Sequence, residues 1–403
     1  MDAYIARQPI LNRRKQVYAY ELLFRDGIHD YTPEVNGDMA TSEVVANSIF
    51  NIGLDEICGN KKSFINFTSN LLLNKSPLLL PKETIVVEIL EDVEPETELV
   101  KACQEIAKKG FLLALDDFVY SPALLPLIKL ADIIKFDFRI STIEKIESDI
   151  KQLPEPRPRL LAEKIETHEE FEIALDLGFE LFQGYFFCKP EIIKSREIES
   201  SQLVHFKIVA TLNSDDLDFN KLENLVTCDV GISYKLLRYI NSPFFATVSK
   251  ISSIKQALVY LGVDELRRFM SLMAISNLAK GKPSELLSMA CIRGKFCELL
   301  GAASGKRVKP TELFTVGMFS LLDAILDQPM NKIIDKIPLS PNLVTALVNK
   351  KGLLAGFLIL IIAYEQGRWT TVKKLAEKLM IPETVIPPIY LEACRWSNQV
   401  ATI

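Results

Sequence analysis

Polar residues interrupt or end several apolar segments in the first half of this 403-residue sequence, and their types suit metal-dependent chemistry. The clearest case is FLLALDDF at 111–118, an apolar run that ends in the paired carboxylates Asp116 and Asp117. Two adjacent carboxylates repel each other unless a positive charge lies between them, and a divalent cation is the usual solution. Taken alone, the pair is equally well explained as solvated aspartates that open a loop.

The same pattern recurs along the chain. Other apolar segments carry or end in charged or amide side chains, namely Glu21, Asn66, Glu88, Lys135, Glu163 and Gln183. An uncompensated charge in such a segment would be costly, so each of these residues needs a partner. If the side chains converge, the five carboxylates and the amide oxygen of Asn66 supply an oxygen-rich site for Mg²⁺ or Mn²⁺.

Such a site predicts chemistry on a phosphodiester. Two divalent cations can clamp the attacking and leaving oxygens during an in-line displacement. Lys135 could orient or deprotonate the attacking water, and Arg25 could bind a phosphate oxygen in a bidentate manner.

Strand-like segments carry these residues through the first two hundred positions. We expect strands at 4–11, 17–24, 63–67, 84–90, 111–118, 133–138, 159–165 and 181–187. Helices are expected between them, the clearest at 94–109 and 167–177. Thr167 and Glu170 have capping-box spacing, and Gly110 and Gly178 suit left-handed helix ends. Alternating strands and helices imply parallel strands with crossovers, and about eight of them predict a closed α/β barrel with its chemistry at the carboxyl ends of the strands.

The second half of the sequence has a different pattern. From about residue 199 it is nearly all helical, with apolar residues at three- and four-residue spacings over 225–240, 254–261 and 265–278. We therefore expect a barrel domain at 1–190, a linker at 191–200 and an all-α domain at 201–403.

Composition narrows the class of protein. Hydrophobic residues make up 48% and charged residues 25%, with a net charge of −5, so no binding to a nucleic-acid polymer is expected. The N-terminus has no signal-peptide core, and the longest apolar run, 353–363, is too short to span a bilayer, so no membrane association is expected. Seven cysteines without a CxxC pair indicate reduced thiols and a cytoplasmic location.

Residues 4–190 resemble an EAL domain, the barrel that binds and hydrolyses cyclic di-GMP. The resemblance depends on an ordered set of motifs, which are Gln8-Pro9-Ile10, then Glu21, Leu23 and Arg25 as ExLxR, Asn66, Glu88 with Glu91, Asp116 with Asp117, Lys135 with Asp137, Glu163 with Glu166, and Gln183-Gly184-Tyr185. No single motif is specific, whereas the set in this order is highly specific.

The resemblance implies a role for each matching residue. Ligands of a first metal would be Glu21, Asn66, Glu88 and Asp116, and the paired aspartates Asp116 and Asp117 would reach a second metal. Glu163 would hold a water molecule at the metal, and Lys135 would position the nucleophile. Gln183 would help to bind the dinucleotide, and Glu166 would support the loop after the paired aspartates.

That loop departs from the family pattern. The family carries Gly-Thr-Gly after the paired aspartates, whereas this chain has Val119-Tyr120-Ser121-Pro122. The family glycine after Glu163 is Lys164 here. Glycine permits backbone conformations that valine and tyrosine resist, so the loop cannot be built in the same way. We expect binding of the dinucleotide to tolerate these changes better than hydrolysis, which needs both metals placed accurately.

The second half resembles an HDOD domain, an all-helical relative of HD phosphohydrolases without their catalytic residues. The matching segments are LLRYINSP at 236–243 and SIKQALVYLG at 253–262. Ser320 and Leu321 occupy the place of the His-Asp pair of active relatives, and no histidine follows His205. The resemblance implies a protein-interaction module, with no metal centre.

Two functions remain open. The first is a signalling protein of the cyclic-di-GMP network whose barrel binds the dinucleotide with weak or lost hydrolysis and whose HDOD domain binds an unidentified protein. The second is a fully active Mg²⁺- or Mn²⁺-dependent phosphodiesterase that produces linear pGpG. The sequence favours the first slightly and leaves open whether the chain forms a homodimer.

Overall fold

The computed structural model describes residues 3–26, 54–191, 208, 211–212, 222–223, 226–227, 230–242, 245, 251–337 and 339–400. The chain divides into two compact units. The first comprises Met1–Phe187 with Glu365–Gly367, and the second Cys188–Tyr364 with Arg368–Ile403. The predicted linker at 191–200 lies almost entirely outside the described residues.

The first unit is a closed barrel, and within the described part of the chain it has eight strands in sequence order. The strands are β1 (Ala3–Asn12), β2 (Val17–Asp26), β3 (Lys62–Phe67), β4 (Ile85–Ile89), β5 (Leu112–Leu115), β6 (Ile133–Asp137), β7 (Arg159–Glu163) and β8 (Leu181–Gln183). Each overlaps a predicted strand. The predicted α/β barrel is therefore confirmed.

One strand runs against the prediction. Strands β2 to β8 run parallel to one another, whereas β1 is antiparallel to both β2 and β8. The cause is the short turn between β1 and β2, in which Lys15 adopts φ +56° and the side chain of Asn12 accepts hydrogen bonds from the backbone N–H groups of Arg14 and Gln16. A turn of this length forms a hairpin, because parallel strands need a longer crossover.

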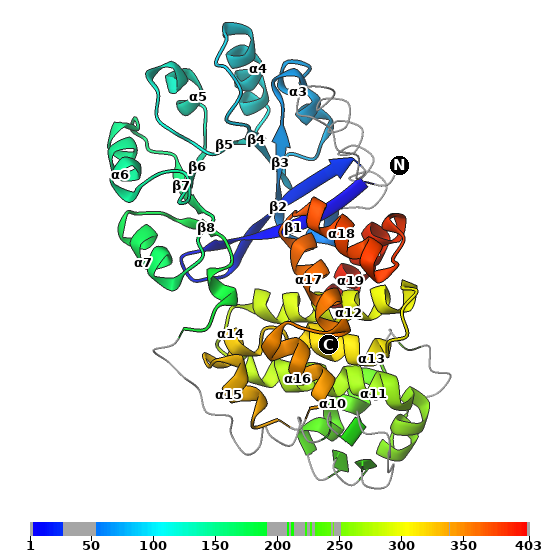
Figure 1. Cartoon of the computed structure of the whole chain (residues 1–403). Helices are drawn as coiled ribbons and strands as arrows, with labels where there is room; N and C mark the ends of the chain where they lie inside the picture. The colour runs from blue at the N-terminus through cyan, green and yellow to red at the C-terminus, as the bar shows by residue number, and fades with distance from the viewer. Residues whose placement is uncertain are drawn as a thin grey trace. The chain divides into compact units, whose positions relative to one another are not determined.

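Helices lie outside the strands of this unit (Figure 1). They are α2 (Leu54–Cys58), α3 (Ser69–Leu73), α4 (Thr97–Lys108), α5 (Leu125–Ile128), α6 (Ile143–Gln152) and α7 (His168–Asp176), with 3₁₀ turns η1 (Ser76–Leu79), η2 (Pro122–Leu124) and η3 (Phe186–Cys188). The predicted capping box is confirmed at α7, where Thr167 and Glu170 bond each other's backbone N–H groups. Gly110 and Gly178 have φ of +94° and +92°, which glycine adopts without strain.

The second unit is helical throughout its described part. Its elements are α10 (Val230–Ile240), α11 (Ile254–Leu278), α12 (Ser284–Ala303), α13 (Pro310–Phe319), α14 (Leu322–Leu326), α15 (Met330–Ile334), α16 (Pro341–Asn349), α17 (Leu353–Glu365), α18 (Trp369–Leu379), η5 (Glu383–Val385) and α19 (Ile386–Val400). Helix α11 joins the two helices predicted at 254–261 and 265–278. The break between them survives as a kink at Gly262, where φ is +70° and ψ is 172°.

One apolar stretch of this unit satisfies the length and composition of a membrane span. It covers Pro341–Glu365, with a mean hydropathy of 1.8 in its most apolar window, half of which is buried. The stretch is divided between α16 and α17, and Lys350 between them has φ +52°. Most side chains of α17 are buried.

Candidate active site

The floor of the candidate site is a layer of apolar side chains inside the barrel, with one residue from each strand. The layer consists of Ile10, Ala19, Phe64, Val86, Ala114, Ile133, Leu161 and Leu181. Side chains in a strand alternate between its two faces, so the residue two positions along points the same way. The residues of the next layer, toward the carboxyl ends of the parallel strands, are therefore those two positions from the apolar residues.

That second layer is polar at every position. Its members are Gln8, Glu21, Asn66, Glu88, Asp116, Lys135, Glu163 and Gln183, each two residues from its apolar counterpart. Asp116 lies one residue beyond the end of β5. Gln8 precedes Ile10 because β1 runs in the opposite direction, and it pairs with Glu21 in the β1–β2 register. The alternation of eight strands thus brings the predicted polar residues to one end of the barrel.

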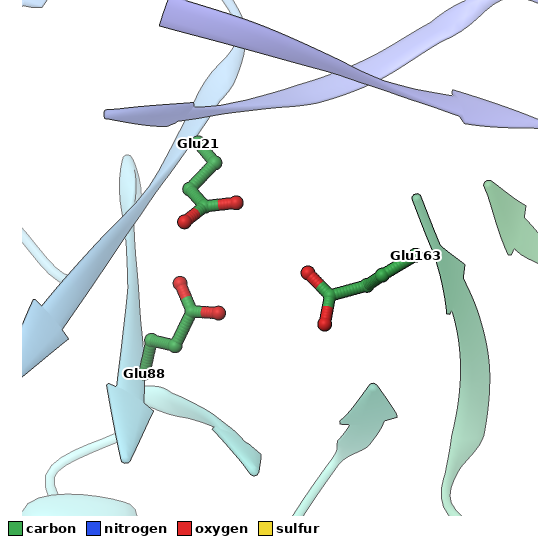
Figure 2. A group of neighbouring side chains, drawn as sticks. All are labelled: Glu21, Glu88 and Glu163. Atoms are coloured by element: carbon green, nitrogen blue, oxygen red, sulfur yellow. The ribbon is translucent and has the colours of Figure 1, made fainter. Parts of the chain in front are cut away.

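Lys135 lies at the centre of this layer and is fully buried. Its Nζ contacts Glu88 Oε1 and lies 2.7 Å from Glu163 Oε1, 2.8 Å from Asp116 Oδ1 and 3.6 Å from Glu21 Oε2. Figure 2 shows Glu21, Glu88 and Glu163 converging from β2, β4 and β7. One ammonium thus faces four carboxylates, so the cluster carries an excess of negative charge.

Burial and mutual repulsion perturb the protonation of this cluster. Burial raises the pKa of Glu88 and Glu163 well above the ordinary value, although Lys135 acts in the opposite direction. Burial alone would lower the pKa of Lys135, but the four surrounding carboxylates outweigh it and raise that pKa. The ammonium of Lys135 is therefore the fixed positive charge of the site, and burial shifts Glu88 and Glu163 toward their protonated forms by raising the pKa of each.

A second group of charges adjoins the first. Asp117 has φ +38°, and its Oδ2 lies 3.6 Å from Nζ of Lys164. The same ammonium contacts Oδ2 of Asp137, a side chain that is 2% exposed. Burial and the neighbouring charge of Asp116 raise the pKa of Asp117. Lys164 therefore partly neutralises the charge of Asp117.

Gln183 is held by two partners. Its Nε2 donates to Glu21 Oε2 at 2.6 Å and to Gln8 Oε1 at 3.1 Å. The amide orientation is thereby fixed, and its carbonyl oxygen Oε1 is buried without a hydrogen-bond partner. Gln183 therefore presents an unsatisfied acceptor within the polar layer.

Further unpaired oxygens indicate what the site can hold. Buried oxygens without a hydrogen-bond partner are Asn66 Oδ1, Glu88 Oε2, Asp117 Oδ1 and Glu163 Oε2. Carboxylate oxygens also lie within 4.8 Å of one another in two groups, Glu21–Glu88–Glu163 and Asp116–Asp117–Glu163. Buried, unsatisfied oxygens with excess negative charge suit a hard divalent cation such as Mg²⁺ or Mn²⁺. The donor set therefore fits one or two such ions, with Glu163 beside both groups of oxygens.

A pocket of about 330 Å³ lies beside the paired aspartates. Its lining is mostly apolar and includes Ile89, Phe118 and Ile140. Val119 also lines it and is 43% exposed. Beyond Val119, the backbone N–H of Tyr120 donates to Asp149 Oδ2 at 3.1 Å, and Pro122 begins η2. The loop after the aspartates is thus anchored on one side of the site.

The structure brings together Glu21, Asn66, Glu88, Asp116, Asp117, Lys135, Glu163 and Gln183. Arg25 lies in β2 opposite Tyr4, but its side chain is outside the described part of the chain. Glu166 is exposed, and its backbone N–H donates to Glu170 Oε2 at 2.8 Å.

Three residues without a predicted role also lie at the site. Gln8 supports Gln183, Asp137 binds Lys164, and Lys164 approaches Asp117. A signal existed for Asp137, because it lies two residues after Lys135 on the same face of β6. For Gln8 the signal was the antiparallel direction of β1.

In the helical unit, Ser320 follows α13 as its C-cap and is buried. Its hydroxyl donates to the carbonyl of Gly317 at 2.7 Å and accepts from Arg293 Nη1 at 3.2 Å. The two clusters of His, Cys, Asp or Glu found close enough for a metal both lie in the barrel, in a search limited to the described residues.

Sequence comparison matches both halves of the chain to known domains. The EAL domain matches residues 39–190, and the HDOD domain matches residues 200–326. The cyclic di-GMP phosphodiesterase CdgJ of Vibrio cholerae is 38% identical over 98% of this chain and 93% of that protein. The uncharacterized protein YuxH of Bacillus subtilis is 34% identical over 99% of both chains.

Solved structures of EAL proteins align with part of the chain. One is a standalone EAL protein from Vibrio cholerae O395 in its c-di-GMP bound form, with 28% identity and a TM-score of 0.35 over 47% of this chain and 92% of that one. Another is the calcium and cyclic-di-GMP complex of Klebsiella pneumoniae BlrP1, with 21% identity and a TM-score of 0.38 over 46% of this chain and 55% of that one. On the full-length identities and both domain matches, the chain belongs to the family of proteins that carry an EAL domain followed by an HDOD domain.

Proposed function

We propose that the barrel binds cyclic di-GMP through one or two Mg²⁺ or Mn²⁺ ions and hydrolyses it only slowly. The observation that carries this proposal is the cluster of four carboxylates around Lys135, with unpaired oxygens on Glu88 and Glu163. The proposal places the chain in bacterial cyclic-di-GMP signalling, which the identity to a cyclic di-GMP phosphodiesterase supports.

Each residue of the polar layer has a role in this proposal. Ligands of the first cation are Glu21, Asn66, Glu88 and Asp116, and those of the second are Asp116 and Asp117. Bound cations would neutralise the charge of the phosphodiester and lower the pKa of the attacking water. Glu163 and Lys135 hold that water by hydrogen bonds, Gln183 binds the dinucleotide, and Arg25 binds a phosphate oxygen. Glu166 supports the loop after the aspartates.

The reaction breaks one phosphodiester of the ring. The water oxygen forms a bond to phosphorus, the bond from phosphorus to the ribose 3′ oxygen breaks, and the proton of the water passes to that oxygen. The product is linear pGpG. Lys135 is suited to this role because its ammonium lies among the carboxylates that would hold the cations.

Slow turnover is supported by the loop after the aspartates. Asp149 holds Tyr120, and Pro122 fixes its own φ at the start of η2, so the segment is stiff. Ser121 is extended, with φ −140° and ψ 139°. A stiff loop beside Asp117 limits adjustment of the second cation. Loss of one stabilising group at a charged transition state costs about 3–4 kcal/mol, or roughly two to three decades in rate.

A second candidate function is a fully active phosphodiesterase. It is favoured by the 38% identity to the Vibrio relative CdgJ, which is named a cyclic di-GMP phosphodiesterase. It is also favoured by the carboxylate set, since all five carboxylates predicted for the site lie in the two groups of close oxygens.

For the helical unit, we propose a protein-interaction role. Its candidate contact residues are the exposed large hydrophobic side chains of α10 and α11, with Tyr234 at 65%, Val259 at 73% and Tyr260 at 52% exposure. The proposal includes domain boundaries at 1–190, 191–200 and 201–403, a cytoplasmic location and no membrane or nucleic-acid polymer as partner. It leaves the homodimer as an open alternative.

The two functions are separated by one comparison on the full chain at saturating Mn²⁺. Formation of pGpG is measured for the wild type and for a variant in which Val119–Pro122 is replaced by Gly-Thr-Gly-Tyr. Slow turnover predicts a faster variant. A wild-type rate equal to that of the variant, and abolished in Glu21→Gln, would establish the fully active enzyme instead.

A further inference from the structure

Lys164 places a second ammonium at the edge of the candidate site. Its Nζ lies 3.6 Å from Asp117 Oδ2 and contacts Asp137 Oδ2. The side chain is 52% exposed, whereas the Asp137 side chain is 2% exposed, so the ammonium reaches inward from the surface. It is distinct from Lys135, which contacts the four carboxylates of the polar layer.

Both ends of Lys164 are restrained. Asp137 is fixed because its Oδ1 accepts from the backbone N–H groups of Arg139 at 2.5 Å and Ile140 at 3.3 Å, which leaves Oδ2 for the lysine. The carbonyl of Lys164 accepts from Arg139 Nε at 3.3 Å, and its φ is +55°. The contacts with Asp137 and Arg139 therefore hold the ammonium of Lys164 near Asp117.

Asp117 offers its other oxygen to the place where a second cation would bind. Asp117 Oδ1 is buried without a hydrogen-bond partner, and a carboxylate oxygen of Asp117 lies within 4.8 Å of one each from Asp116 and Glu163. A divalent cation there would share Asp117 with the ammonium of Lys164. Two positive charges on one carboxylate repel each other, and each weakens the attraction of the other for it.

We propose that Lys164 is a tethered counter-ion of Asp117 that weakens the second divalent-cation site, so that the chain binds one cation tightly and a second only at high concentration. The inference rests on the proposed function and deepens it, because it names a positioning residue that sets how many cations the barrel holds. It also gives slow hydrolysis a second structural cause besides the loop.

The test is a titration of the metal-free full chain with Mn²⁺, followed by the electron paramagnetic resonance signal of free Mn²⁺, which gives stoichiometry and affinity without any turnover. We compare wild type with Lys164→Met, which removes the charge, and Lys164→Arg, which keeps it. The matched control is Lys75→Met. Lys75 also has a left-handed backbone, with φ +56°, and its side chain is 41% exposed. Its Nζ pairs with one carboxylate, that of Glu105, at 2.5 Å.

The expected result is one tight and one weak Mn²⁺ in the wild type. Removal of the charge in Lys164→Met should tighten the weak site by about tenfold or more at low ionic strength. The Lys164→Arg and Lys75→Met variants should bind Mn²⁺ as the wild type does. The inference is overturned by two equally tight ions in the wild type, by no change in Lys164→Met, or by an equal change in Lys164→Arg or Lys75→Met.

Failure of the proposed function gives a different pattern. The tight Mn²⁺ should be lost in Glu21→Gln, whose carboxylate belongs to the first cation group. If that loss occurs while Lys164→Met changes nothing, the inference fails and the proposed site stands. If wild type and Lys164→Met both bind no Mn²⁺, both fail.

Discussion

Removal of the central ammonium in Lys135→Met tests the electrostatics of the site. Lys135 is fully buried, and its Nζ lies within 3.6 Å of oxygens from four carboxylates. Loss of one partner from a buried ion pair typically costs about 3–5 kcal/mol, because the remaining charge is buried without compensation. For a domain of this size, that corresponds to a fall of roughly 6–20 °C in the unfolding temperature of the barrel.

The matched control for this variant is Lys75→Met. Lys75 also pairs with a glutamate, but both partners are about half exposed, so its loss should cost only about 0.2–1 kcal/mol. Thermal and urea unfolding with EDTA would measure both variants. Saturating Mn²⁺ should recover much of the loss in Lys135→Met, because bound cations supply positive charge to the same oxygens, whereas hydrolysis should stay absent.

A small loss of stability in Lys135→Met would refute this reasoning. If Lys135→Met with EDTA destabilises the chain no more than Lys75→Met does, the four carboxylates are not compensated by Lys135. If Mn²⁺ stabilises Lys75→Met as much as Lys135→Met, the cations do not bind where the ammonium acts.

Three further predictions follow from the barrel. Burial raises the pKa of Glu88 and Glu163 above 4.5, so the folded metal-free chain binds protons that the unfolded chain releases. Its free energy of unfolding should therefore fall as pH rises from about 5.5 to about 8, and Mn²⁺ should stabilise the chain more at the higher pH. Urea titrations at both pH values, with and without Mn²⁺, measure the two effects. Thr167→Ala removes the cap of α7 and should cost about 1 kcal/mol in urea unfolding, and no change would contradict the capping geometry. Gly184→Ala should destabilise the chain by more than about 1 kcal/mol, because φ of Gly184 is +144° and a Cβ there would collide with the backbone of Ile165. A variant as stable as the wild type in urea unfolding would contradict this prediction.

The sequence was sufficient to predict the barrel and most of its polar layer. Each strand pairs an apolar inward residue with a polar one two positions along, as in Val86 and Glu88, and that pattern is local. The direction of β1 was predicted wrongly, because the pattern of alternating strands and helices was extended to β1, which a short turn and not a helix joins to β2. The Asn12 side chain closes that turn, and a hairpin was its direct consequence.

Contacts between strands could not be predicted in the same way. Lys135 and Glu88 are 47 residues apart, and their contact depends on rotamers that all eight strands constrain together. The approach of Lys164 to Asp117 depends on two residues with positive φ, at +55° and +38°, a conformation that is uncommon for residues other than glycine. Such positions are set by tertiary packing, so the sequence identified the residues but not their partners.

Equilibrium binding of cyclic di-GMP to the full chain, with Mn²⁺ and with EDTA, tests the central claim most directly. The decisive variant is Glu88→Gln, whose side chain is fully buried among the carboxylates, and its control is Glu105→Gln, an exposed glutamate on α4 of the same barrel. We predict that wild type and Glu105→Gln bind the dinucleotide in Mn²⁺ and at least about tenfold more weakly in EDTA, and that Glu88→Gln binds weakly in both. Equal affinity of all three chains, with or without Mn²⁺, would contradict the claim that these carboxylates form a cation-dependent cyclic-di-GMP site.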